Sequence, residues 1–214
     1  MAIAHIATAA TASTPITVAF TSAPTGEVYV GVLATGMGCT VGGLGLSWSM
    51  VGLVDYIIGF PPKRLYVWRG SAGVPVAGDL TIASVGMGST VNAYSIVMAD
   101  PTMIGVIAFN ANRTDLGTDP FPLTMPAATN ARNTTLAFFC TEGVPVYTAS
   151  GAIILGQASS IASMWSFPVA TTIAFSHNGG SHNCAFGLEL GRATPNTTLA
   201  LRHIGKTSFI LTEP

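Results

Sequence analysis

The segment from His177 to Cys184 gathers the residue types that most often bind metals. It reads His-Asn-Gly-Gly-Ser-His-Asn-Cys, so two imidazoles and one thiol fall within eight residues and could ligate zinc. The spacing matches neither a zinc finger nor a pair of ligands on a helix. The Asn178-Gly-Gly sequence is a strong tight-turn signal, which favours a β-hairpin with His177 and His182 as surface residues beside the turn. We therefore expect no metal and no other cofactor.

Nucleophilic catalysis also lacks a recognisable arrangement in this sequence. It needs a serine or cysteine beside a histidine that an acid orients. No Gly-x-Ser-x-Gly motif occurs, and no acidic residue is near His177 or His182 in the sequence. Asp115 and Asp119 could act as a carboxylate pair on a sugar or hold calcium, but the loop-forming residues around them favour an exposed polar loop. We assign no catalytic residue and expect that the chain is not an enzyme.

Aromatic residues offer a binding alternative. The residues concerned are Trp48, Tyr66, Trp68, Arg69, Tyr94 and Trp165. The rings could stack on a sugar, and the arginine beside Trp68 could add a cation–π contact. The favoured interpretation is that these side chains belong to the core or to a protein interface, where most aromatic residues of sandwich proteins lie.

Charged residues are unusually scarce. They make up 8% of the 214 residues and give a formal net charge of −1, whereas an average soluble protein has about 25%. Without a basic field, the chain is not expected to bind nucleic acid. Two explanations of the scarcity stay open: partners cover much of the surface, or neutral Thr, Ser and Asn side chains keep it wet.

The sequence indicates no membrane span and no signal peptide. The uncharged stretches 28–54 and 143–188 are too often interrupted by Gly, Pro and polar residues to form a spanning helix. The N-terminus has no basic region followed by a continuous apolar run. Three cysteines, Cys39, Cys140 and Cys184, are odd in number and far apart, so we expect free thiols and synthesis in a reducing cytoplasm.

Short apolar runs separated by turn residues predict an all-β antiparallel sandwich or barrel. The expected strands are 15–20, 27–34, 45–51, 56–58, 65–69, 80–84, 93–98, 104–110, 123–125, 134–140, 152–155, 163–168, 171–176, 184–190, 198–203 and 208–212. Residues 159–163 suggest one short helical turn. No tandem repeat at a fixed period is found. We expect residues 1–14 to be an extended arm or an edge strand and residues 15–214 to form a single sandwich domain.

Several expected strands are apolar on both faces, as in Ile104-Gly-Val-Ile-Ala-Phe109. One face of a sandwich strand packs inward. A second apolar face therefore indicates a second partner, which connects the low charge to assembly.

The order of the sequence motifs resembles a known family. The matching segments are Thr25–Leu33, Gly45-Leu-Ser-Trp48, Leu65-Tyr-Val-Trp-Arg-Gly-Ser-Ala72, Gly78–Ile82, Ala93–Met98, Asp100-Pro-Thr102, Thr134–Phe139 and Ala185–Leu190. Together they resemble, over roughly residues 15–190, the jelly-roll-like virion structural proteins of bacteriophages. Only Tyr66-Val-Trp-Arg69 is fairly specific. The family's Pro-Pro-x-Gly-Trp turn is missing before Trp48, and residues 203–214 have no counterpart.

This resemblance implies a sandwich of jelly-roll type and a place in the virion. We expect a capsid decoration or cement protein that binds the outer shell and stabilises it through oligomeric contacts, with a homotrimer favoured. Its partners would be the major capsid protein or other virion proteins. The alternative is a receptor- or carbohydrate-binding module of a tail, fibre or spike. An enzyme ranks last, and the family pattern carries no catalytic residues.

Overall fold

A computed structural model describes residues 3–58, 61–114, 119–142, 144–178 and 182–192. Within these residues the chain forms sixteen β-strands and no helix, and every strand pairing is antiparallel. The expected all-β antiparallel sandwich of jelly-roll type is therefore confirmed. Short runs of Val, Ile, Thr and aromatic residues between Gly and Pro turns account for this outcome.

The first eight strands form the N-terminal half. They are β1 (Ile3–Ser13), β2 (Ile16–Phe20), β3 (Val28–Thr35), β4 (Gly38–Gly43), β5 (Leu46–Ile57), β6 (Lys63–Gly73), β7 (Gly78–Val85) and β8 (Thr90–Ala99). They build an inner five-stranded sheet of order β1-β8-β3-β6-β5 and an outer three-stranded sheet of order β2-β7-β4. This alternation between two sheets is the arrangement of a jelly roll.

The remaining strands form the C-terminal half. They are β9 (Met103–Thr114), β10 (Phe121–Thr124), β11 (Thr134–Thr141), β12 (Val144–Ser150), β13 (Ile153–Ala158), β14 (Ile161–Ser166), β15 (Thr172–Asn178) and β16 (Asn183–Arg192). Their inner sheet has the order β9-β16-β11-β14-β13 and their outer sheet the order β10-β15-β12. Each strand thus takes the place of the strand eight positions earlier, so the topology repeats although the sequence has no fixed period.

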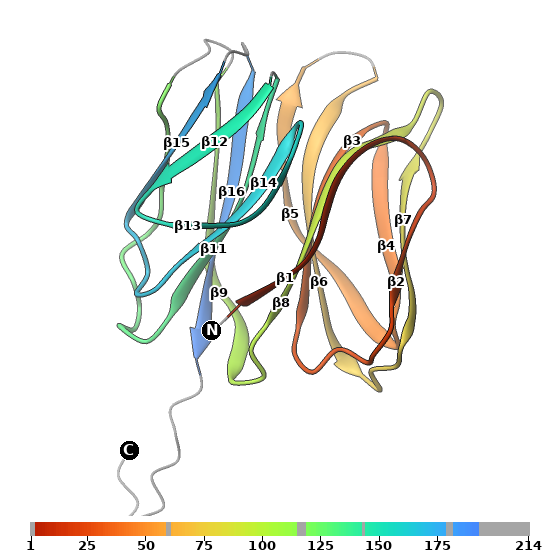
Figure 1. Cartoon of the computed structure of the whole chain (residues 1–214), viewed down its shortest axis with the longest axis horizontal. Helices are drawn as coiled ribbons and strands as arrows, with labels where there is room; N and C mark the ends of the chain where they lie inside the picture. Colours follow the sequence, from red (N-terminus) through yellow and green to blue (C-terminus); the bar gives the residue numbers. More distant parts are fainter. Residues whose placement is uncertain (1–2, 59–60, 115–118, 143, 179–181, 193–214) are drawn as a thin grey trace, which may run out of the picture.

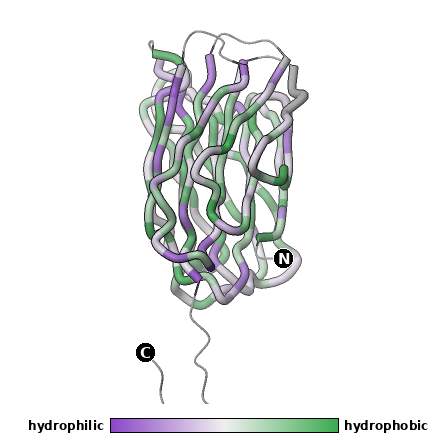
Figure 2. The backbone as a smooth tube through the Cα atoms, turned by 90° about the vertical axis from the view of Figure 1, so that its left-hand side faces the viewer, coloured by the Kyte–Doolittle hydropathy of each residue, from purple (hydrophilic) through white to green (hydrophobic). Residues whose placement is uncertain are grey.

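The four sheets stack as four layers, with the two inner sheets face to face (Figure 1). The central core between the inner sheets contains Tyr29, Phe138 and Phe186. A second core lies between the sheets of the N-terminal half, and a third, built around Phe139 and Phe175, lies between those of the C-terminal half. Figure 2 looks from the side of β10, β15 and β12 and shows short hydrophilic segments alternating with hydrophobic ones along the strands.

The halves meet as a symmetric dimer would. At one long edge β1 lies beside β13, and at the other β5 lies beside β9. Because β13 is the counterpart of β5 and β9 that of β1, the two edge contacts are equivalent. Reciprocal contacts of this kind are the signature of a two-fold axis, here an approximate one within a single chain.

Stacking also explains why several strands are apolar on both faces. All eight residues of β11 are buried, as are the first nine of β16. Both strands belong to the inner sheet of the C-terminal half. One face of each lies in the central core, and the other lies in the third core, called the outer core below. For these strands the second partner is another layer of the same chain.

The structure confirms some of the expected elements and contradicts others. Residues 3–13, left open as an arm or an edge strand, form edge strand β1, which pairs with β8. The expected helical turn at 159–163 is wrong, because β14 already begins at Ile161. Strands β4 and β12 were not expected, and the strands expected at 198–203 and 208–212 lie outside the described residues. The division into 1–14 and one domain at 15–214 stays a prediction.

Candidate interaction surface

The histidines and the cysteine of segment 177–184 do not form the expected hairpin. Strand β15 pairs with β10 and β12, whereas β16 pairs with β11 and β9, so the two strands belong to different sheets. The hairpin expectation is wrong because β15 and β16 lie in different layers and do not pair with each other. His177 packs on the ring of Phe139 in the outer core, with ring centroids 6.0 Å apart, whereas Cys184 lies in the central core.

Both histidines already have a hydrogen-bond partner. The Asn183 amide nitrogen donates to Nε2 of the buried His177 at 2.9 Å, and the Thr141 hydroxyl donates to the side-chain oxygen of Asn183 at 2.7 Å. His182 Nδ1 lies 2.8 Å from the Glu142 carboxylate. Across the described ranges, no three His, Cys, Asp or Glu side chains are grouped so that they could hold a metal. The metal candidates His177, His182 and Cys184 therefore face different surroundings.

The three cysteines are buried and unoxidised. Burial raises the pKa of the Cys39 thiol to about 12. Burial, together with the thiol of Cys184 opposite it in the sheet, raises the pKa of Cys140 well above its usual range. Because the thiolate is the reactive form, these shifts leave both groups poor nucleophiles.

Of the two aspartates that could form a carboxylate pair, the structure describes only Asp119. Asp115 lies outside the described residues. The Asp119 carboxylate accepts a hydrogen bond from the backbone N–H of His177 at 3.3 Å. Such a contact fixes the segment before β10 against β15 and requires no ligand.

The aromatic candidates are divided between two cores. Tyr66 is buried in the core of the N-terminal half, where Trp48, Trp68 and Tyr94 pack against it, whereas Trp165 packs against the central core. The Trp48 indole donates to the Gly43 carbonyl at 3.0 Å. These side chains therefore do not assemble into one exposed platform.

Arg69 is engaged by a carboxylate. Its guanidinium binds both oxygens of Glu27, and the Tyr29 hydroxyl donates to the same carboxylate at 2.5 Å. Burial and the acceptor Glu27 raise the pKa of Tyr29, which stays protonated. Hydrogen bonds and charge attraction from Glu27 raise the pKa of Arg69 in turn. The three side chains form a closed network.

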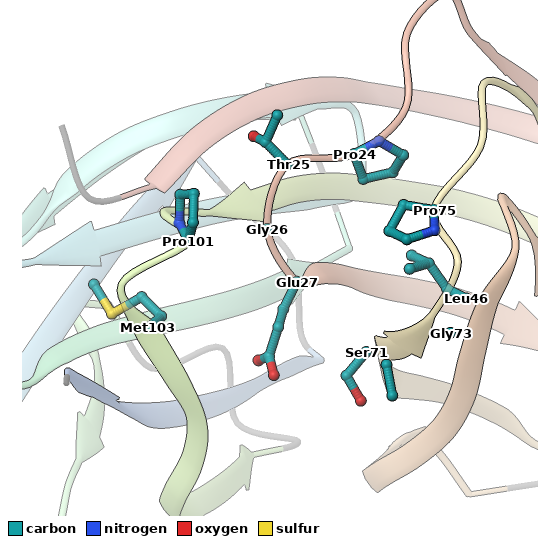
Figure 3. Close-up of a pocket in the computed structure, with 11 residues that line it drawn as sticks. Pro24, Thr25, Gly26, Glu27, Leu46, Ser71, Gly73, Pro75, Pro101 and Met103 are labelled. Atoms are coloured by element: carbon teal, nitrogen blue, oxygen red, sulfur yellow. The ribbon is translucent and has the colours of Figure 1, made fainter.

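Glu27 also lines a pocket of about 210 Å³ at one end of the N-terminal half. Figure 3 shows Pro24, Pro75 and Pro101 around it, with the chain passing through Gly26 into the segment that carries Glu27. No aromatic side chain lines the pocket, and its one charged lining residue is already paired with Arg69. This pocket offers little for recognition of a sugar.

The most distinctive exposed surface lies where β5 and β9 run side by side. We call it the open edge, defined by Met50, Leu53 and Phe109, whose exposed fractions are 47%, 40% and 54%. The Phe109 ring stacks on Phe186 at 5.5 Å, and a Cβ at Gly52 would lie 2.7 Å from that same ring. Phe109 therefore lies against a ring of the central core, whereas Met50 and Leu53 pair across the sheet with Trp68 and Tyr66 of the N-terminal core. All three side chains face solvent.

Both strands of the open edge are also edge strands of their sheets. Each has twelve residues and contains neither Pro nor Lys. Their charged residues are Asp55, which pairs with Arg64 at 2.7 Å, and Arg113. Proteins usually protect long apolar edges with charges or prolines, so an unprotected pair favours contact with another chain. The apolar run 104–109 was the sequence signal for this surface; Met50 and Leu53 gave none.

Comparison with family models, with curated proteins and with solved structures finds no match in any of the three. Among the described residues, no helix has the length and apolar character needed to cross a bilayer.

Proposed function

We propose that this protein is a structural component of a bacteriophage virion. Its most specific role in this proposal is that of a capsid decoration protein, which binds the outer shell and stabilises it as an oligomer, with a trimer favoured. Sister copies and the major capsid protein or other virion proteins are the partners. A bridge between neighbouring subunits stabilises a shell because opening the shell would expose the bridging interface to water.

The open edge is the single observation that carries the proposal. Stacking inside the chain covers both faces of the inner sheets, but it leaves Met50, Leu53 and Phe109 exposed. Apolar side chains on two adjoining, nearly uncharged edge strands suit burial against another protein. The jelly-roll topology and the low charge agree with this role.

A receptor- or carbohydrate-binding module of a tail, fibre or spike is the weaker alternative. Sugar recognition usually requires exposed aromatic rings beside polar groups that are free to bind hydroxyls. Here Trp48, Trp68 and Trp165 pack against cores, and Arg69 is occupied by Glu27. These placements favour an interface with protein over a site for sugar.

The test compares particles that carry the protein with particles that lack it. Particles with the wild-type protein are expected to withstand higher temperature before they release their genome. Particles offered the double variant L53S/F109S should resemble particles without the protein, because the two polar side chains weaken the interface. Thermal release of nucleic acid, followed with a DNA-binding dye, gives the measurement.

A matched control is Met87→Ser, which replaces another exposed apolar residue in the turn between β7 and β8. This variant should protect particles as well as the wild-type protein does. Equal heat resistance with and without the wild-type protein would contradict a stabilising role. Copy number on the particle separates the two candidates, since hundreds of copies favour decoration and a handful favours a tail or fibre.

A further inference from the structure

A groove of about 550 Å³ lies beside the beginning of β9, apart from the open edge. Ile104 and Ile107 line it and are 58% and 46% exposed. Both side chains lie over Gly191 of β16, where a Cβ would approach each of them to less than 3.0 Å. The absence of a side chain at Gly191 leaves space for the two isoleucine side chains, which pack over its backbone and remain exposed to solvent.

Three hydrogen bonds in the groove wall converge on one carboxylate oxygen of Glu189, Oε1. Thr129 donates to the buried Glu189 carboxylate through both its N–H, at 2.9 Å, and its hydroxyl, at 2.8 Å. The Asn133 amide donates to the same oxygen at 2.6 Å and accepts the N–H of Arg192 at 3.2 Å. These bonds hold the wall rigidly against β16. The groove presents the exposed side chains of Ile104 and Ile107 to solvent, so its occupant should offer apolar side chains.

The chain itself leaves the described structure at this groove. Arg192 ends β16, lines the groove and pairs with Met103, the first residue of β9. Twenty-two residues follow, 193–214. They contain six large apolar residues, which are Leu199, Leu201, Ile204, Phe209, Ile210 and Leu211. Since an extended residue spans at most about 3.3–3.6 Å, the seven residues up to Leu199 can lead out of the groove and back to it.

We propose that segment 193–214 folds back and docks its apolar side chains, Leu199 and Leu201 first, over Ile104 and Ile107 of the same molecule. Attachment at Arg192 gives the segment a millimolar effective concentration at the groove, which a second copy reaches only in concentrated solution. Docking removes the two isoleucines from water and leaves Met50, Leu53 and Phe109 free. The inference is therefore independent of the proposed function, which rests on the open edge.

Trypsin offers a direct test because the segment contains Arg202 and Lys206. In the intact wild-type protein, docking should slow cleavage at both sites. The double variant I104S/I107S should raise the cleavage rate about fivefold or more, because cleavage follows the population of the undocked segment. The control Met87→Ser, distant in the fold, should leave the rate unchanged. Mass spectrometry of timed samples identifies the sites and gives the rates.

A second variant pair keeps the test informative if the groove substitutions disturb folding. L199S/L201S changes only the segment and should accelerate cleavage at Arg202 and Lys206 to the same extent. Equal rates in the wild-type protein and in both double variants would overturn the proposal. Protection that grows with protein concentration would overturn it as well, since the segment would then dock on another copy. Protection that is independent of concentration supports docking within one molecule.

Discussion

The two long edges of the inner layers occupy equivalent places but differ in chemistry. At the open edge, β5 and β9 present Met50, Leu53 and Phe109 to solvent. At the other edge, β1 and β13 approach closely, because Gly156 leaves room for the side chains of His5 and Thr8. One topology thus provides one edge suited to a partner and one edge closed by its own strands.

A chain of hydroxyl groups runs inward from the closed edge. His5 Nε2 lies 2.8 Å from the Thr8 hydroxyl, which lies 2.7 Å from that of Ser95. Ser95, on β8, donates to Ser163, on β14, at 2.8 Å, and both serines are fully buried. The closed edge is therefore joined by polar contacts between the halves, whereas at the open edge Gly52 of β5 approaches the ring of Phe186, on which Phe109 stacks.

Removal of a ring beneath the open edge should have the largest effect. Phe186→Ala deletes a buried side chain of the central core and the ring on which Phe109 stacks. We expect the free energy of unfolding to fall by about 3–5 kcal/mol, as for other buried aromatic truncations. Chemical denaturation gives the value. Ile153→Ala, at an exposed position of the closed edge, should change it by less than about 0.5 kcal/mol. Similar losses of unfolding free energy in Phe186→Ala and Ile153→Ala would contradict the difference proposed between the two edges.

The hydroxyl chain of the closed edge predicts an intermediate effect. Ser95→Ala leaves the buried hydroxyl of Ser163 without its partner, whereas the half-buried Thr8 keeps its contact with His5. The free energy of unfolding should fall by about 1–3 kcal/mol, the usual cost of unsatisfied buried polar groups. Ser49→Ala, at an exposed position of β5, serves as the control and should be nearly neutral. If Ser95→Ala left the free energy of unfolding unchanged, the hydroxyl contacts would not contribute to joining the two halves.

Acid should weaken the hydrogen bonds to Glu189 in the groove wall next to β9. Burial of Glu189 acts to raise the pKa of its carboxyl, but hydrogen bonds from Asn133 and Thr129 outweigh it and lower the pKa below its ordinary value. The unfolded chain therefore takes up the proton first, so this carboxylate stabilises the fold above its unfolded pKa of about 4.3, and the contribution is lost as pH falls through the folded pKa.

The corresponding measurement is denaturation of the wild-type protein and Glu189→Gln at pH 7 and at pH 3. At pH 7 we expect the variant to be about 1–2 kcal/mol less stable, since hydrogen bonds to a charged acceptor are the stronger ones. At pH 3 the difference should shrink. A difference that stays the same at both pH values would assign the loss to packing instead of charge.

The sequence predicted the strands better than their partners. Thirteen of the sixteen strands overlap an expected strand, because period-two apolar runs and turn residues are local signals. Strand β4 was missed because Gly38-Cys-Thr-Val-Gly-Gly43 is half glycine. A turn signal such as that at Asn178 does not specify which sheet the next strand joins. That choice is made by contacts distant in the sequence.

The surface was predicted only in part for a similar reason. Strands that are apolar on both faces predicted a second partner, yet for β11 and β16 the second cover is another layer of the same chain. The aromatic residues were expected in the core or at an interface, and the structure places them in or against two cores. At β5 and β9 some apolar side chains reach solvent, and of these only the run 104–109 stood out in the sequence.

Light scattering of the purified protein tests the central claim, that the open edge is an interface, most directly. The wild-type chain should have the mass of an oligomer, and the double variant L53S/F109S, which changes two exposed side chains, should have the mass of a folded monomer. Met87→Ser should remain an oligomer. A wild-type protein that is monomeric at all concentrations, or an L53S/F109S variant that still assembles, would contradict the account.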